Sequence, residues 1–207
     1  MEASPRPRAV LFDAYGTLFD VYSVGLLAEQ LFPGQGERLA LLWRDKQIEY
    51  TRLVSMSGRY QPFWDLTRAG LRFAAQRLQL PMDAAAEERL MNQYRHLSAF
   101  PENRPVLVEL QRRGVPGGIL SNGDPAMLQV AVKSAGFAGL LQHLISVDAV
   151  QRYKTDPAAY ALGPQALGLP GAYYYWLDVV DQQAGIVQEP LPAVARLPGV
   201  YLAAIGK

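Results

Sequence analysis

The sequence predicts an α/β fold in which a Rossmann-like parallel sheet core carries an inserted helical cap domain. After residue 104, short apolar segments alternate with helical patterns, which is typical of a parallel sheet. Residues 22–98 show helical periodicity and no strand pattern. We therefore expect a core domain made of residues 1–20 and 99–207, and a cap domain made of residues 21–98.

Four segments have the apolar pattern of buried β-strands bounded by turn residues. They are AVLF (9–12), GGILS (117–121), AYYYWL (172–177) and, more weakly, HLISV (143–147). In open α/β sheets, ligands bind outside the carboxyl ends of the strands. Asp13, Ser121 and Asp178 each fall at or just beyond such an end, so we expect them to face a site.

Helical patterns separate these strands and fill the inserted segment. In the core, helices are expected over 105–114 and 125–136, the second with Asp124 as its N-cap and Pro125 at its first position. Pro164 predicts a kink or break in the helix that follows Asp156. The helical stretches of the insert are 22–31, 36–55, 63–79 and 83–98.

The composition is that of a globular chain and excludes several classes of function. The 207 residues are 50% hydrophobic and 19% charged, which suffices for one sizeable core. A net charge of +1 without a Lys or Arg block gives no attraction for nucleic acid. Cysteine is absent, which excludes disulfides and a thiolate nucleophile. The N-terminus MEASPRPRAV lacks a signal peptide and no apolar run suits a membrane span, so we expect a cytoplasmic protein.

Asp13 is the strongest candidate for chemistry. A carboxylate at the end of a buried strand costs free energy unless it interacts there. With Gly16 and Thr17 in the following turn, it can act as a covalent nucleophile, while the turn N–H groups and the Thr17 hydroxyl hold its other oxygen. The competing interpretation is a turn or N-cap aspartate, and spacing alone leaves both open.

Four segments together resemble the L-2-haloacid dehalogenase branch of the haloacid dehalogenase superfamily. They are AVLFDAYGTLFDVYSV (9–24), LWRDKQIEYT (42–51), ILSNGD (119–124) and SVDAVQRYKTDPAAY (146–160). They occur in the family's order and at compatible spacing over about residues 8–170, which is far more specific than one short motif. The resemblance implies hydrolytic dehalogenation of short 2-haloalkanoic acids to 2-hydroxy acids through an ester on Asp13, with no metal or other cofactor.

The resemblance also implies a set of site residues. The catalytic set is Asp13, Thr17, Arg44, Ser121, Lys154, Tyr160 and Asp181. The substrate-binding set is Tyr15, Ile48, Phe63, Asn122 and Asp178. In this set Arg44 receives the halide and Lys154 keeps Asp13 ionised. Each has a structural alternative, such as a solvated surface arginine or lysine, a turn asparagine, or a core tyrosine.

Tyr15 stands where superfamily phosphatases typically carry a second aspartate, which is their general acid and part of their Mg²⁺ site. Tyrosine cannot replace a carboxylate as a ligand of a hard cation. The residue therefore disfavours phosphoryl transfer. A Mg²⁺-dependent phosphatase that uses the aspartates at 13, 178 and 181 is the third-ranked alternative.

The fourth motif departs from the family. Dehalogenases have approximately S-S-N-x-W-D there, whereas this chain has YYYWLDVVDQQAGIVQEP (173–190). Aligned on the strand, Asp178 falls on the family Asn and Asp181 on the family Asp, the expected base. Two interpretations stay open: an altered dehalogenase in which Asp181 activates water, or a weakly active or non-catalytic homologue.

The expected partner is a small 2-haloacid substrate. Dehalogenases of this branch are often dimers through the cap helices, and LALLWRDKQIEYTRLV (39–54) supplies apolar residues for such a homodimer. The same residues serve equally well as part of the chain's own core.

Overall fold

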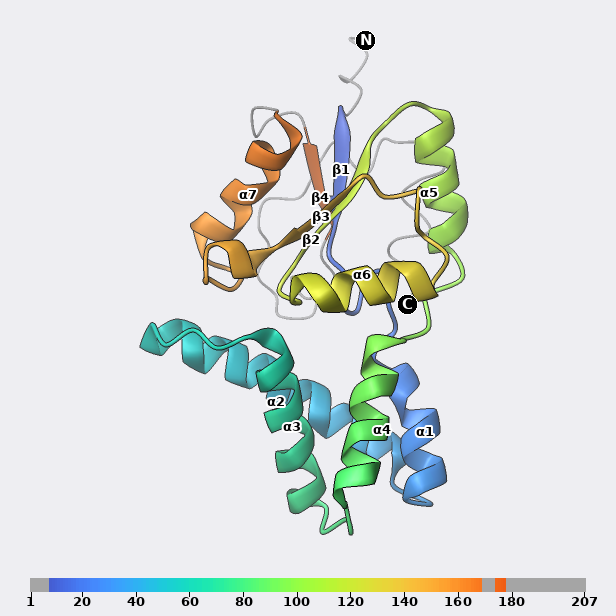
Figure 1. Ribbon diagram of the computed structural model, residues 1–207, viewed down its shortest axis with the longest axis vertical. Helices are drawn as coiled ribbons and strands as arrows, with labels where there is room; N and C mark the ends of the chain where they lie inside the picture. The colour runs from blue at the N-terminus through green and yellow to red at the C-terminus, as the bar shows by residue number, and fades with distance from the viewer. Residues whose placement is uncertain (1–7, 169–173, 178–207) are drawn as a thin grey trace, which may run out of the picture.

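The sheet is parallel and lies in the upper half of the molecule in the view of Figure 1. This computed structural model describes residues 8–168 and 174–177. The strands are β1 (Ala9–Phe12), β2 (Gly117–Ser121), β3 (His143–Ser146) and β4 (Tyr174–Leu177). Their order is β3-β2-β1-β4. The predicted α/β class is confirmed, and the four predicted strands match to within two residues at either end.

The register brings two predicted site residues to the same edge of the sheet. Phe12, the last residue of β1, pairs with Ile119 of β2 and with Leu177 of β4. Asp13 follows directly, and Ser121 ends the neighbouring strand β2. Since all strands run in one direction, the carboxyl ends meet at the edge where open α/β sheets bind ligands.

Three helices pack against the sheet. They are α5 (Asn103–Arg112), α6 (Pro125–Ser134) and α7 (Pro157–Leu167), and a 3₁₀ turn η2 (Val147–Ala149) follows β3. The break predicted at Pro164 is wrong, because α7 runs without interruption through it to Leu167. Pro164 lies in the last turn, where its missing N–H removes one helical hydrogen bond only. Gly168, at φ 60°, ends the helix in the left-handed conformation that favours glycine.

Four further helices, here called the cap helices, lie together below the sheet in Figure 1. They are α1 (Val24–Leu31), preceded by the 3₁₀ turn η1 (Val21–Ser23), α2 (Gly36–Ser57), α3 (Phe63–Arg77) and α4 (Ala84–Arg95). Their ends follow local signals. The Asp83 carboxylate accepts from the N–H of Ala86 at the start of α4, and Gly58, at φ 66°, ends α2. The helices predicted for the insert are thus confirmed.

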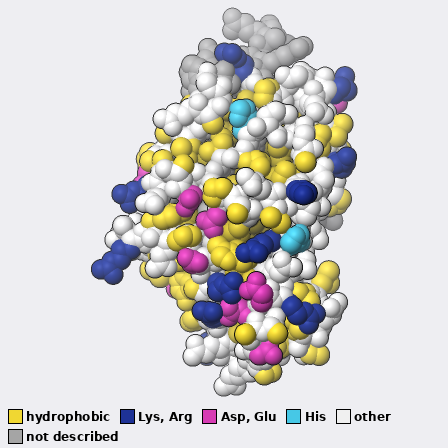
Figure 2. All heavy atoms as spheres, viewed as in Figure 1, with side chains coloured by type: hydrophobic (Ala, Val, Ile, Leu, Met, Phe, Trp, Pro, Cys, Tyr) yellow, Lys and Arg dark blue, Asp and Glu magenta, His cyan; other side chains and the backbone are white. Residues whose placement is uncertain are grey.

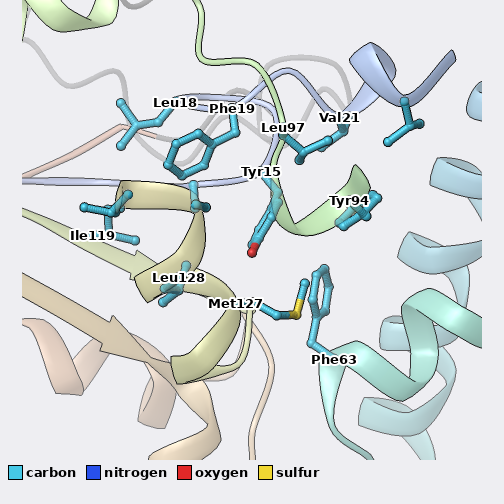
Figure 3. Close-up of a cluster of buried hydrophobic side chains, with 14 of the residues drawn as sticks. Tyr15, Leu18, Phe19, Val21, Phe63, Tyr94, Leu97, Ile119, Met127 and Leu128 are labelled. Carbon is cyan, nitrogen blue, oxygen red and sulfur yellow. The ribbon is translucent and has the colours of Figure 1, made fainter. Parts of the chain in front are cut away.

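One cluster of buried apolar side chains extends from the sheet into the cap helices. On the sheet side it includes Leu11 and Ile119, and among the cap helices it includes Trp43 and Leu71. Figure 3 shows the part where the two meet, around Tyr15. Because the buried surface is continuous, the cap helices are held on the carboxyl edge of the sheet by apolar burial.

Charged side chains of both signs gather on the outer surface of the cap helices in the view of Figure 2. Glu87 of α4 accepts from Arg72 and Arg68 of α3, each at 2.7 Å. The hydrogen bond from Arg72, together with that from Arg68, lowers the pKa of Glu87. In the part of the chain that the structure describes, no helix has the length and apolarity needed to cross a membrane.

Helices α1 and α2 touch at two glycines. A Cβ added to Gly36 would lie 2.5 Å from the carbonyl oxygen of Gly25 and 2.7 Å from the Cβ of Glu29. The Glu29 carboxylate accepts from the N–H groups of Gly34 and Gly36, which lowers its pKa. Only a glycine at position 36 allows this close approach, since backbone atoms cannot yield to a side chain.

Gly36→Ala is therefore expected to destabilise the protein by about 1–3 kcal/mol, the usual cost of overpacking. Gly25→Ala is the matched control, because the nearest atoms to its Cβ would be the Gly36 oxygen at 3.5 Å and the Ala40 Cβ at 3.6 Å, both ordinary contacts. It should be neutral or stabilising by up to about 1 kcal/mol through helix propensity. Urea unfolding measures both, and equal losses would contradict this packing.

Candidate active site

Asp13 and Lys154 form a buried ion pair at the carboxyl end of β1. Lys154 Nζ donates to Asp13 Oδ1 at 2.7 Å, and the two side chains are only 6% and 10% exposed. The residues are 141 positions apart in the chain, so the fold itself brings them together. A cation at this distance favours the ionised carboxylate, which is the form that acts as a nucleophile.

The loop after Asp13 folds tightly back on itself. The Ala14 carbonyl oxygen accepts from the N–H groups of Leu18 and Phe19, each at 2.9 Å, and Gly16 adopts φ 101°. Asn103 of α5 holds the loop from below by donating to the Thr17 carbonyl oxygen at 2.9 Å. This turn is the predicted Gly-Thr turn, and it fixes where the Asp13 carboxylate stands.

Two hydroxyls in this loop are buried without a hydrogen-bond partner among the described residues: Tyr15 Oη and Thr17 Oγ1. A buried hydroxyl left unpaired costs free energy. Both follow Asp13 within four residues, so they can bind polar atoms of a molecule that enters beside it. Burial, the largest cause, raises the pKa of Tyr15 well above its ordinary value, so this hydroxyl stays protonated.

The residues at the end of β2 and in the loop after it position Lys154. Asn122 Oδ1 accepts from the Lys154 backbone N–H at 3.0 Å. Ser121 is fully buried, and its Oγ accepts from the Gly123 N–H at 3.1 Å. Gly123 in turn lies against the Tyr15 ring, where a Cβ would be 2.5 Å from Cε2. The loop after β2 and the loop after β1 therefore interlock around the ion pair.

Arg44 reaches this place from α2. Its Nη2 donates to the Tyr15 carbonyl oxygen at 2.9 Å, and its Nη1 donates to Gln47 Oε1 at 2.8 Å. The side chain is half-buried at the junction of the cap helices and the sheet, and the Tyr15 carbonyl that it contacts lies two residues after Asp13 in the chain. The alternative of a solvated surface arginine is wrong, because both ends of the guanidinium are bonded within the protein.

Aromatic rings form one wall of the site. In Figure 3 the Tyr15 ring extends from its loop toward Phe63 of α3 and Tyr94 of α4. The ring centroids of Tyr15 and Phe63 are 5.5 Å apart, and those of Tyr15 and Tyr94 are 5.8 Å apart. All three residues are buried. Tyr15 and Phe63, both predicted as substrate-binding residues, thus come into contact.

The remaining predicted residues lie on α2, on α7 or outside the described residues. Ile48 lies on α2 one turn after Arg44 and is half-buried. Tyr160 lies on α7, half-buried, and packs against the apolar core. Asp178 and Asp181 lie outside the described residues, so the expected base stays a prediction. Across residues 8–168 and 174–177, no three His, Cys, Asp or Glu side chains are grouped as ligands of a metal.

Asp124 corrects one expectation. It occupies the N-cap position of α6, as predicted, but its side chain makes no hydrogen bond to that helix. Its carboxylate instead accepts from the N–H groups of Phe63 and Trp64, at 3.1 and 2.8 Å, and so caps α3 across the junction. The N-cap of α3, Pro62, has no side-chain group that could do this.

Two tyrosine hydroxyls also hold the segment that leads into α3, each through one hydrogen bond. No local sequence signal indicates either contact. Tyr60 Oη donates to Asp148 Oδ1 and Tyr153 Oη donates to the Gln61 carbonyl oxygen, both at 2.7 Å. Together with Asp124 they hold the start of α3 on the sheet. Phe63, the first residue of α3, is thereby fixed against Tyr15.

Asp124→Asn is expected to change how stability depends on pH. Burial raises the pKa of Asp124 above its ordinary value of 3.8, against the hydrogen bonds from Trp64 and Phe63, which lower it. The stability that this carboxyl contributes is therefore complete below pH 3.8 and is lost as pH rises through the higher value of the folded state. Between pH 3.8 and the higher pKa of the folded state, the free energy of unfolding of the wild type should therefore fall relative to that of Asp124→Asn. Urea unfolding at a series of pH values measures it, and parallel pH curves would contradict it.

Known proteins with related sequences all point to one family. A family model described as haloacid dehalogenase-like hydrolase matches residues 7–174. The chain is 45% identical over 162 residues to the (S)-2-haloacid dehalogenase of Pseudomonas sp. (strain YL), a match that covers 78% of this chain and 70% of the relative. It is 40% identical over 161 residues to a haloacetate dehalogenase of Moraxella sp. (strain B), covering 78% of this chain and 72% of the relative.

Solved structures give the same result. The crystal structure of an L-2-haloacid dehalogenase superimposes with a TM-score of 0.80 at 60% sequence identity, covering 83% of this chain and 78% of that one. The L-2-haloacid dehalogenase of Xanthobacter autotrophicus, with chloropropionic acid covalently bound, gives a TM-score of 0.78 at 39% identity, covering 83% and 69%.

Proposed function

Because the chain belongs to the haloacid dehalogenase-like hydrolase family, we propose that it hydrolyses short (S)-2-haloalkanoic acids to 2-hydroxy acids through an ester on Asp13. The observation that carries this proposal is the buried contact of 2.7 Å between Asp13 and Lys154. It provides an ionised carboxylate in a place shielded from water, which makes the carboxylate a stronger nucleophile.

In the first step, an Asp13 carboxylate oxygen attacks C2 of the substrate from the side opposite the halogen. The new C–O bond forms as the carbon–halogen bond breaks, and the halide leaves with the electron pair. The Arg44 guanidinium, whose two bonded ends face neutral acceptors, receives this anion. The wall formed by Tyr15 and Phe63 encloses the apolar part of the substrate.

In the second step, water attacks the carboxyl carbon of Asp13. The ester C–O bond on that carbon breaks, the 2-hydroxy acid leaves with inverted configuration, and the water protons pass to a base and to the product oxygen. We assign the base role to Asp181 and place Asp178 beside the substrate, as the family likeness implies. The overall reaction consumes one water and releases one halide ion and one proton.

The remaining predicted roles complete the proposal. Thr17 and Ser121 supply short donors for the carboxylates, and Asn122 does so while it holds the Lys154 backbone. Tyr160 places its hydroxyl near the site, and Ile48 extends the apolar wall from α2.

We also propose that residues 21–98 act as a cap domain on a core of residues 1–20 and 99–207, in a cytoplasmic homodimer. The exposure of Leu41, Leu53 and Met56 on α2, at 45%, 50% and 85%, supports a dimer through the cap helices.

A halide electrode tests this function on the full chain incubated with L-2-chloropropionate. We expect chloride release with that enantiomer, with lactate of inverted configuration as the product. The runner-up activities give different results. A phosphatase would release phosphate from p-nitrophenyl phosphate with Mg²⁺ and no chloride, and a non-catalytic homologue would release neither. Either of these results would overturn the proposal.

A further inference from the structure

Gln47 is a buried amide that contacts the halide-side arginine. It lies on α2, three residues after Arg44, and is 0% exposed. Its Oε1 accepts from Arg44 Nη1 at 2.8 Å and from Tyr94 Oη at 3.0 Å. Its Nε2 donates to Thr67 Oγ1 at 2.5 Å. Every polar atom of this side chain is thus bonded inside the protein.

The chemistry of the neighbours fixes which way the amide points. Arginine has donors only, so the amide oxygen must face it. The Thr67 hydroxyl donates to the Phe63 carbonyl oxygen at 2.7 Å, which leaves its lone pairs to accept from Gln47 Nε2. Burial raises the pKa of Tyr94, so its hydroxyl keeps the proton that it donates to Gln47. A reversed amide would place its NH₂ group against the donors of Arg44 and Tyr94, and its oxygen against the lone pairs of the Thr67 hydroxyl.

Close packing prevents the amide from shifting. Helix α3 approaches α2 at Gly70, where a Cβ would lie 3.2 Å from the Gln47 backbone nitrogen. Trp43 Nε1 donates to the Thr67 carbonyl oxygen at 2.7 Å and holds the two helices together at this level. The Gln47 amide is therefore bonded to Thr67 of α3 and to Tyr94 of α4. Because the amide is fixed, it also fixes the position of Arg44 Nη1, which it binds.

Arg44 is held at two points, and both acceptors are uncharged. The Tyr15 carbonyl oxygen holds Nη2 and the Gln47 amide oxygen holds Nη1. Among the described residues, no carboxylate forms an ion pair with Arg44 within 4.0 Å. Neutral acceptors orient the guanidinium without neutralising it, so its positive charge stays available for an anion.

We infer that Gln47 is a positioning residue, which fixes the Arg44 guanidinium where the halide leaves. The inference rests on the proposed function, because it assigns Gln47 to the carbon–halogen cleavage step. A misplacement of a catalytic group by about 1 Å can cost about a hundredfold in rate. Gln47 is thus expected to act on kcat for halide release far more than on substrate KM.

Gln47→Met tests this, because methionine has a similar length and no acceptor for Arg44. We expect kcat for chloride release from L-2-chloropropionate to fall about 10- to 100-fold, and by less with L-2-bromopropionate, since bromide leaves with less assistance. Thr51→Val is the matched control: Thr51 is buried on α2, and its hydroxyl donates to the Ile48 carbonyl oxygen. It should keep the wild-type ratio of bromide to chloride rates.

A double-mutant cycle separates positioning from a merely structural effect. In an Arg44→Lys background, Gln47→Met should cost less than about threefold in kcat, because the group that it positions is already gone. If the losses in kcat from the two substitutions multiply, or if Gln47→Met leaves the bromide-to-chloride ratio unchanged, the inference is overturned.

If Gln47→Met fails to fold, Gln47→Glu replaces it. This isostere keeps the acceptor oxygens but adds a negative charge beside Arg44, and it should weaken inhibition by added bromide. Unchanged bromide inhibition would overturn the inference.

The two proposals fail in different ways. A wild-type chain that releases no halide from either substrate contradicts the proposed function. A wild-type chain that releases halide while Gln47→Met retains its full kcat contradicts the role of Gln47 alone.

Discussion

Asp13→Asn is expected to abolish halide release, with a rate at least about a thousandfold below that of the wild type. Asparagine has nearly the same shape as aspartate, but its amide is a far weaker nucleophile than a carboxylate. No other side chain in the proposed reaction forms a bond to C2. A halide electrode with L-2-chloropropionate measures the rate.

The same substitution leaves the Lys154 ammonium without its carboxylate partner. The lysine side chain is 6% exposed, and breaking a buried ion pair costs about 3–5 kcal/mol. The loss of activity must therefore be shown on folded protein, by circular dichroism and urea unfolding. Asp13→Asn combined with Lys154→Met removes both charges and is the matched control for stability. A folded Asp13→Asn variant with more than a few per cent of wild-type activity would contradict the nucleophile.

Lys154→Met is the second substitution with a large expected effect, a fall of at least about a hundredfold in kcat. Without the cation, the buried Asp13 carboxyl takes up a proton and no longer attacks carbon. Because the ionised form returns as pH rises, the residual activity should increase with pH where the wild-type rate is flat. Halide release across a pH series measures this.

Lys133→Met is the control, since Lys133 is an exposed lysine in the last turn of α6. Lys154→Arg provides a second comparison, because it keeps a positive charge at that position. A Lys154→Met variant within a few-fold of the wild-type rate, with an unchanged pH profile, would show that the ion pair at 2.7 Å is structural only.

The sequence predicts the elements whose signals are local. β1 is a short apolar run that ends at an acid, α4 begins at the capping aspartate Asp83, and Gly58 ends α2. The parallel sheet follows from the alternation of strands and helices. The break predicted at Pro164 is wrong. A proline in the last turn of a helix removes only one helical hydrogen bond, and the packing of the helix can offset that loss.

Contacts between distant segments have no comparable signal. The family likeness places Asp13 and Lys154 in one site. No sequence signal predicts that Asp124 caps α3, because Asp124 lies 61 residues from Phe63 in the chain. Gln47 is a partial exception, because its position one turn after Arg44 puts both on one face of a helix. That its amide also meets Thr67 and Tyr94 depends on how three helices pack.

The terminal segment stays at the level of prediction. Its departure from the family pattern, with Asp178 in place of the family Asn, is visible in the sequence alone. Among the described residues, those around Asp13 can form the ester, and the second step depends on the base assigned to Asp181. Halide release in a single burst, without further turnover, would identify a chain in which only the first step survives.

A single turnover in water enriched in oxygen-18, with enzyme in excess over L-2-chloropropionate, tests the central claim most directly. If Asp13 forms the ester, the product takes its new oxygen from the enzyme and carries no label, and mass spectrometry finds oxygen-18 in the peptide that contains Asp13. Labelled product together with an unlabelled Asp13 peptide would mean that water attacks C2 directly, which contradicts a covalent intermediate.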